Sequence, residues 1–382
     1  MPMSLNTNVL SLSSQRNLRN TQASLAETVN RLSTGFRINS AKDDAAGLSI
    51  TERMTTQING LSISQRNASD GISFVQTAES ALTLMSTSLQ RMRELAVQSL
   101  NDTNTNLDRE ALNLEYQSIV SELERVAQTT AFNGRNILDG TTGQLKFQIG
   151  PNQGQTISVS GVDARTTTLG ETVFSRVRGN NAGSEPGAGE SYESESGEQL
   201  LVDGLTIDLG DISTLDGAVT RINEKTSQTG TFAFINDAGG VTFMKEGNTA
   251  PNVDVSAGSI PFTYFGHDDN TQDVVTYNVA ETGVERRDDA LIALPVIDNA
   301  LDELSSLRAG YGATQNRFEN VIELAAVLNE NLSMARARIR DTDFAMETAE
   351  LTRLQILQEA GLASVVQANA SQQSVLSLLG GR

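Results

Sequence analysis

Few residues of this chain have the types and spacing that catalysis or metal binding needs. The only histidine, His267, stands beside Asp268 and Asp269, so a Ser-His-Asp relay has one candidate base and no context for it. One imidazole and two carboxylates are also too few ligands for a dedicated calcium site. We interpret His267 as a loop residue.

Asp43 and Asp44 are the paired carboxylates that acid-base chemistry would need. They follow Ser40 at a predicted helix start, where a carboxylate stabilises the positive end of the helix dipole. We therefore prefer helix capping to acid-base catalysis. The HExxH, GxxxxGK, GxSxG and CxxC patterns are absent, so the sequence predicts neither an enzyme nor a bound cofactor or metal.

The stretch LQRMRELAVQSLNDTNT at residues 89–105 places Arg91 and Arg93 among evenly spaced apolar residues. A solvated helix face is the ordinary interpretation of such charges. Leu95 and Val97, however, lie off the predicted apolar face and beside the arginines, which leaves an apolar strip for a contact. We predict a surface that binds protein.

The composition narrows the classes of protein to which this chain can belong. It has 382 residues, no Cys, no Trp and only 4% aromatic residues, so we expect an aliphatic core without disulfides. The net charge of -19 opposes nucleic-acid binding, which requires clustered cations. No stretch has the length and apolarity of a membrane span, and no basic segment precedes an apolar one at the N-terminus. We therefore expect neither membrane insertion nor a cleaved signal peptide.

The elements that position these residues are mostly helical. Leu18, Leu25 and Leu32 repeat at seven-residue spacing, which is typical of a coiled-coil seam. Gly35 interrupts the seam, and Ser40 with Asp43 three residues later predicts a new helix start.

Two further apolar patterns, at 78–99 and 112–126, predict antiparallel helices joined by the NDTNTN loop. Alternating apolar residues then predict a β-hairpin around turn-forming glycines. The residues that define this hairpin are Phe147, Ile149, Gly150, Gly154 and Ile157.

The middle of the chain changes character. Residues 176–195 have the composition of a linker. Strand patterns near 205–209 and at TFAFI and VTFM, together with a short helix capped by Ser213, predict a small acidic β/α domain inserted between helical flanks.

Helical pattern returns near residue 288 and continues for about forty residues. The sequence DTD at 341–343 breaks it. A last amphipathic stretch follows, with apolar positions at Leu351, Leu354, Leu362, Val365, Leu376 and Leu379. The few large apolar residues of the two terminal segments do not offset the entropy of ordering them, so we expect both segments to be disordered in the monomer and to fold on assembly.

Together the patterns predict a mainly α fold: a long antiparallel, coiled-coil-like helical bundle with a β-hairpin and a small inserted mixed α/β outer domain. Both ends of the chain also resemble bacterial flagellin. The stretches that carry the resemblance include SLNTNVLSL, LSTGFRINSAKDDAAGLSI, NASDGISFVQTAESAL, FNGRNIL, GATQNRFENVI and LTRLQILQEAGLASVVQAN.

This resemblance covers residues 1–165 and 288–382, and it implies three kinds of domain. Residues 1–40 and 345–382 would be the inner-tube terminal helices, disordered in the monomer. Residues 41–175 and 286–344 would form the helical shell domain with its hairpin. Residues 176–285 would be the variable, surface-exposed outer domain.

The resemblance also implies a function and partners. The chain would be a secreted structural subunit that polymerises with many copies of itself into the extracellular flagellar filament for motility. Its C-terminal helix would bind the type III export chaperone, and its filament would meet cap and junction proteins. The hairpin would switch the filament between supercoil forms.

Host Toll-like receptor 5 would recognise the filament protein as a secondary consequence. In the family its contact surface falls on residues that correspond here to Arg91, Leu95 and Glu122. These positions also lie between protofilaments in the family, so their role for the bacterium would be assembly.

Two alternatives remain open at this point. One is a hook-filament junction protein of the same superfamily. The other is a secreted adhesin carried by the acidic middle domain, for which the available aromatic residues are few: Tyr192, Phe262, Tyr264 and Phe265.

Overall fold

The structure is a computed structural model, and it describes residues 7–178, 199–210, 212, 214–235, 240–254 and 273–380. Contacts divide the chain into two compact units. Unit 1 contains residues 1–69, 148–156 and 319–382, and unit 2 contains 70–147 and 157–318.

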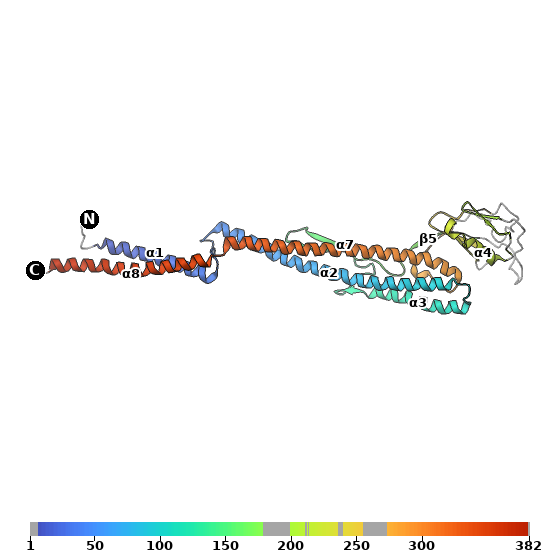
Figure 1. The fold of residues 1–382 in the computed structure, drawn as a ribbon, viewed down its shortest axis with the longest axis horizontal. Coiled ribbons are helices and arrows are strands. Elements are labelled where there is room, and N and C mark those ends of the chain that lie inside the picture. Colours follow the sequence, from blue (N-terminus) through green and yellow to red (C-terminus); the bar gives the residue numbers. More distant parts are fainter. Residues whose placement is uncertain are drawn as a thin grey trace. The chain divides into compact units, whose positions relative to one another are not determined.

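Long helices dominate the fold, which confirms the prediction of a mainly α protein. They are α1 (Val9–Thr34), α2 (Ala45–Ser99), α3 (Asn106–Thr129), α7 (Arg287–Arg340) and α8 (Phe344–Gly380) (Figure 1). At 54 residues, α7 is longer than the pattern predicted. No helix within the described ranges combines the length and apolarity that a membrane span needs.

Helix ends follow from local capping residues. The side chain of Asn8 accepts a hydrogen bond from Ser11 N and begins α1, and Gly35 ends it in the left-handed conformation with φ 72°, which costs glycine little. The NDTNTN loop ends in a capping box between Thr105 and Asp108 that starts α3.

The predicted helix start at Ser40 is wrong. Asp43 Oδ2 accepts bonds from Asn39 N, Ser40 N and Ser40 Oγ, and these bonds close an isolated turn and lower the pKa of Asp43. It is Asp44 that caps α2, because its Oδ1 accepts from Gly47 N at 2.9 Å. The capping interpretation therefore applies to Asp44 only.

Unit 2 is built around an apolar core between α2, α3 and α7. Glycine at residue 71 leaves room for the ring of Phe318, because a Cβ there would lie only 2.5 Å from Phe318 Cζ. The Phe318 ring meets Phe147 edge to face with centroids 5.5 Å apart. Tyr116 lies fully buried in this core, and its hydroxyl is 2.6 Å from Thr282 Oγ1.

Two short hairpins follow α3. Strands β1 (Ala131–Phe132) and β2 (Arg135–Asn136) pair across a tight turn in which Asn133 and Gly134 both have positive φ, as such turns require. Strands β3 (Gln144–Gln148) and β4 (Thr156–Ser160) pair as the second hairpin, which was predicted.

The described residues of the inserted domain form two antiparallel sheets. The four-stranded sheet has the order β11-β5-β9-β8, and the three-stranded sheet β10-β6-β7. Their strands are β5 (Thr172–Arg178), β6 (Gln199–Val202), β7 (Leu205–Asp208), β8 (Thr231–Ile235), β9 (Val241–Glu246), β10 (Val253–Asp254) and β11 (Asp273–Tyr277).

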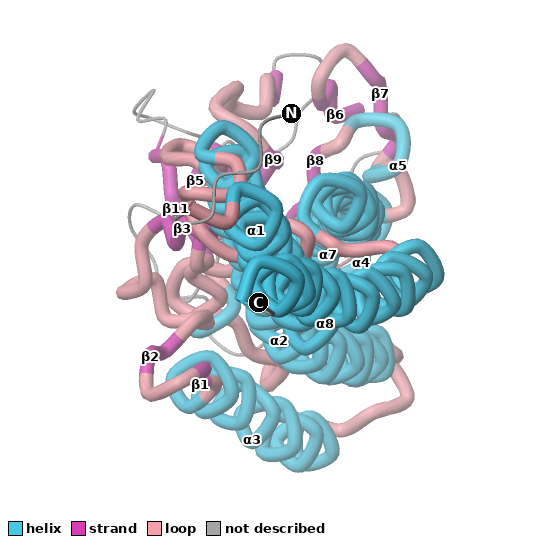
Figure 2. Tube along the Cα trace, turned by 90° about the vertical axis from the view of Figure 1, so that its left-hand side faces the viewer, coloured by secondary structure: helices cyan, strands magenta, loops and turns pink. Residues whose placement is uncertain are grey.

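Helix α4 (Leu215–Asn223) contributes Ala218, Val219 and Ile222 to a core shared with β6 to β9, and it packs beside β8 (Figure 2). Thr214, rather than the predicted Ser213, caps it, with Thr214 Oγ1 accepting from Gly217 N at 3.2 Å. The described residues also include the short helices α5 (Thr226–Thr229) and η1 (Val279–Glu281). The predicted domain boundary at 175/176 falls inside β5, because this strand begins at Thr172.

Candidate functional site

The terminal helices α1 and α8 lie side by side in unit 1 (Figures 1 and 2). Leu18, Leu25 and Leu32 of α1 are all partly buried, as the seven-residue repeat predicted. On α8, Leu354 is 4% exposed, and Leu351 and Val365 are partly buried.

Leu362 does not belong to this seam, because it is 50% exposed. Gly361 takes the seam position instead, and a Cβ there would lie 3.3 Å from Leu18 Cδ1. The two helices therefore approach closely at this level. The side chains of Leu376 and Leu379 lie outside the described residues.

Much of the seam is small or polar. Asn8 Nδ2 donates to Ala368 O at 3.0 Å, and the hydroxyls of Ser14 and Ser364 are 3.3 Å apart. Such bonds favour one register of the pair, while the apolar burial between the two helices remains modest.

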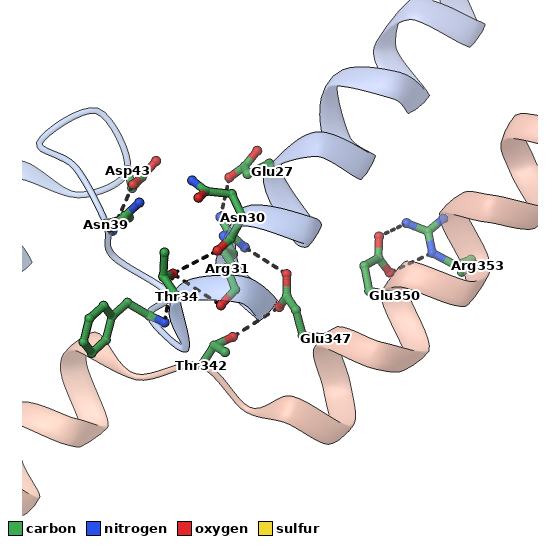
Figure 3. A network of polar contacts seen from close by, with 11 residues as sticks. Glu27, Asn30, Arg31, Thr34, Asn39, Asp43, Thr342, Glu347, Glu350 and Arg353 are labelled. Atoms are coloured by element: carbon green, nitrogen blue, oxygen red, sulfur yellow. Dashed lines mark hydrogen bonds and ion pairs between the residues drawn. The ribbon is translucent and has the colours of Figure 1, made fainter.

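The two chain segments that leave this helix pair clasp each other (Figure 3). Arg37 N donates to Arg340 O at 2.6 Å and Thr342 N to Gly35 O at 3.0 Å, and the Arg340 guanidinium lies 4.4 Å from the Phe36 ring centroid. We call residues 35–37 and 340–342 the corner clasp. Sequence reasoning found the two breaks but not their pairing, for which neither segment carries a local signal.

Glu347 sits beside the corner clasp and is only 9% exposed. Its carboxylate lies 4.0 Å from Arg31 Nη1, accepts from Thr342 Oγ1 at 3.3 Å and is drawn with both partners in Figure 3. A buried carboxylate needs such partners, so this site fixes the junction of α1 and α8.

Outside the seam, the helix pair leaves large apolar side chains exposed. They are Val9, Leu10, Leu12, Val29, Phe344, Met346, Ile356, Leu357, Leu362 and Val366. Their exposure ranges from 43% at Leu357 to 71% at Met346. Apolar surface of this extent marks an interaction site.

The charged stripe of α2 lies in unit 2. Arg91 donates to Glu115 Oε1 on α3 at 2.9 Å and to Glu94 Oε2 at 3.0 Å, and these bonds raise the pKa of Arg91. Arg93 donates to Asp298 on α7 at 2.6 Å. The arginines therefore link α2 to both neighbouring helices while staying about half exposed.

Leu95 is fully buried, so the prediction that it faces outward is wrong. Helix α2 packs between α3 and α7, and it buries a wider stripe than a single seam requires. Val97, two residues later, is 48% exposed and lines a shallow groove with Gln90 and Arg93. Glu122 lies on the α3 surface and accepts from Arg125 Nε at 2.7 Å, which lowers the pKa of Glu122.

The five predicted hairpin residues have different surroundings. In unit 2, Phe147 packs among aromatic rings and Ile157 is 3% exposed. In unit 1, Ile149 N donates to Gln155 O at 2.8 Å, Gly154 has φ 85°, and a Cβ on Gly150 would lie 2.1 Å from Gln155 Oε1.

The hairpin tip in unit 1 rests on α2. Asn67 Nδ2 donates to Gln148 O at 2.8 Å. A Cβ on Gly60 would lie 2.7 Å from Pro151 Cβ, so glycine at this position lets the tip approach the helix. Sequence reasoning missed both Gly60 and Asn67.

The described part of the chain contains no group of three or more His, Asp or Glu residues that could hold a metal ion. His267 and the aromatic residues considered for an adhesin, Tyr192, Phe262, Tyr264 and Phe265, lie outside the described residues.

Comparisons with known proteins agree with this architecture. Family models of the bacterial flagellin N-terminal and C-terminal helical regions match residues 5–142 and 294–379. Flagellin A of Vibrio cholerae is 39% identical over 388 residues, covering 99% of this chain and 100% of its own. B-type flagellin of Pseudomonas aeruginosa is 35% identical over 489 residues, with the same coverage.

Among solved structures, FliC from Burkholderia pseudomallei is 28% identical to the chain, with a TM-score of 0.41, and covers 65% of this chain and 99% of its own. Flagellins match nearly the whole sequence at 35% identity or more, which favours a filament subunit over the hook-filament junction alternative. The chain belongs to the bacterial flagellin family, the structural subunits of the flagellar filament.

Proposed function

We propose that α1 and α8 are the helices through which subunits polymerise and that they form the inner tube of the filament. The observation that supports this most directly is the exposed apolar surface around the pair, with Val9, Leu12, Ile356 and Val366 each at least 53% exposed. An isolated helix pair with a largely polar seam is marginal in water. Neighbouring copies would bury this surface and order both helices.

A single substitution tests the proposal. Ile356→Glu places a charge on the exposed face without touching the seam, so the folded part of the monomer is expected to keep its circular dichroism spectrum. Burying an unpaired carboxylate between copies is costly, so the critical concentration for polymerisation should rise about tenfold or more. Polymerisation at the normal concentration would contradict the proposal, and Ile356→Leu serves as the control.

We infer corresponding roles for the rest of the chain. Residues 41–175 and 286–344 would form the shell domain around the inner tube, and residues 176–285 the exposed outer domain. Residues 1–40 and 345–382 would be disordered before assembly, which hydrogen exchange of the monomer and of the filament would distinguish.

We propose that the β3-β4 hairpin switches the filament between supercoil forms. The contacts of its tip with Gly60 and Asn67 define one packing, and a displaced tip would define another. Gly60→Val is expected to displace the tip and change the helical pitch seen by electron microscopy. An unchanged pitch would count against this role.

We further propose that the surface around Arg91 and Glu122 contacts neighbouring protofilaments and, in a host, Toll-like receptor 5. Both side chains are about half exposed, whereas Leu95 is buried and acts only through packing. Arg91→Glu should weaken receptor signalling without loss of monomer helicity. If receptor signalling and monomer helicity fell together, Arg91 would serve only the fold of the subunit.

We propose the remaining partners by analogy with the family. We propose export by the flagellar type III apparatus, with the exposed apolar face of α8 held by a chaperone, and contacts with cap and junction proteins at the filament ends. Pull-down with a chaperone, with and without α8, tests the first contact. We assign the chain no catalytic role.

A further inference from the structure

Each terminal helix carries a second stripe of residues on the side away from the seam. These residues follow one another at alternating steps of three and four, so each set shares one helical face, and all are exposed. On α1 the stripe consists of Val9, Leu12, Arg16, Arg19, Ala23, Ala26 and Asn30. On α8 it consists of Ala345, Ala349, Thr352, Ile356, Glu359, Ala363, Val366 and Ala370.

The charges on the two stripes have no partner among the described residues. Elsewhere on these helices, Arg31 pairs with Glu27 and Glu347, and Glu350 pairs with Arg353. The side chains of Arg16, Arg19 and Glu359 take part in no ion pair or hydrogen bond within the described ranges. Two cations thus remain on the outer face of α1 and one anion on the outer face of α8.

These three charges lie at the same level of the helix pair. Gly361 of α8 is opposite Leu18 of α1, and Arg16 and Arg19 flank Leu18 while Glu359 precedes Gly361 by two positions. Because both stripes face away from the seam, the opposite charges are turned from each other within one chain. They can meet only between chains.

We propose that the α1 stripe of one subunit packs against the α8 stripe of a neighbouring copy, with Arg16 and Arg19 facing the neighbour's Glu359. The proposal rests on α1 and α8 being the assembly helices and adds which faces meet. The alanines of both stripes permit a close approach of the helices. Val9, Leu12, Ile356 and Val366 supply apolar area, and the charges fix which helix meets which.

Charge exchange between full-length chains tests the pairing. One variant carries Glu359→Arg, and the other carries Arg16→Glu with Arg19→Glu. Each alone brings like charges together, so each should raise the critical concentration for polymerisation about tenfold or more. An equimolar mixture should polymerise nearly as the unmodified chain does, because each variant then meets its complement in the other. Circular dichroism checks that both monomers keep the fold.

A chain with all three substitutions separates the possible outcomes, and it should polymerise by itself. Recovery in this chain but not in the mixture would mean that the charges pair within one subunit, which overturns the proposal. Normal polymerisation of either charge variant alone would also overturn it. If the charge variants and Ile356→Glu all polymerise normally, the terminal helices have no role in assembly. If Ile356→Glu polymerises poorly while the charge variants polymerise normally, only the charge pairing is refuted.

Discussion

At the scale of single residues, Asp288 in the first turn of α7 has a carboxyl group whose ionised form is disfavoured in the folded protein. Burial first, and then the nearby charge of Asp289, raise the pKa of its carboxyl from 3.8 to about 6. A carboxyl whose pKa is raised on folding destabilises the folded state above that pKa, and this penalty disappears as the pH falls below the unfolded value.

Asp288→Asn should therefore stabilise unit 2 at pH 7.5 by about 1 to 2 kcal/mol, after allowance for partial exposure of the carboxyl. The gain should decline as the pH falls below 6 and vanish near pH 3.5. Denaturant unfolding at several pH values measures it. A gain that is the same at every pH would show that charge is not its cause.

Leu95 and Val97 of α2 offer a matched pair of substitutions. Leu95 is fully buried and Val97 is 48% exposed. Leu95→Ala should lower the free energy of unfolding by about 2 to 5 kcal/mol through the cavity that it leaves, whereas Val97→Ala should change it by less than about 0.5 kcal/mol. Equal effects in thermal unfolding would contradict the burial of Leu95.

The burial of Leu95 also shows a limit of sequence patterns at this scale. The apolar pattern at 78–99 predicted one buried helix face, and Leu89, Met92 and Ala96, which follow its spacing, are all buried. Leu95 was predicted to face outward because it lies beside the single narrow apolar face that the pattern predicts for this helix. The wider buried stripe arises from having partners on two sides, α3 and α7, and the periodicity of α2 alone does not contain that information.

At the scale of elements, the corner clasp lies in unit 1 where α1 is followed by α2 and where α7 is followed by α8. Arg340 lies over the Phe36 ring and 3.8 Å from Glu52, while Arg338, two residues earlier, is exposed. Arg340→Ala should weaken the filament by about 1 kcal/mol per subunit, which corresponds to a roughly fivefold higher critical concentration. Arg338→Ala is the matched control, and an equal effect of both would deny the clasp this role.

The elements themselves were largely predictable, because heptad spacing, Gly35 and the DTD sequence at 341–343 are local signals. The features that the sequence did not predict depend on tertiary contacts, or on local sequences that fit two structures about equally well. Leu362 was predicted only as an apolar position of the last helix, and it lies exposed outside the seam, because apolar residues occur all around α8 and the pattern does not show which of them face α1. Ser40 was taken for a helix cap because a turn closed by Asp43 uses the same spacing.

At the scale of the whole molecule, the chain enters and leaves the inserted domain through adjacent strands. Thr172 at the start of β5 pairs with Tyr277 at the end of β11, so a short linker can join residues 171 and 278. We expect a chain with a Gly-Ser linker in place of 172–277 to polymerise, since the proposed assembly helices are unaffected. Failure to polymerise while the helices stay folded by circular dichroism would give this domain a part in assembly.

We propose above all that the terminal helices build the filament. Electron microscopy of the purified full chain, compared with a chain lacking residues 1–35 and 350–382, tests it most directly. The full chain should form filaments, and the truncated chain should form none at concentrations well above the critical concentration of the full chain. Filaments that still grow from the truncated chain would contradict the account.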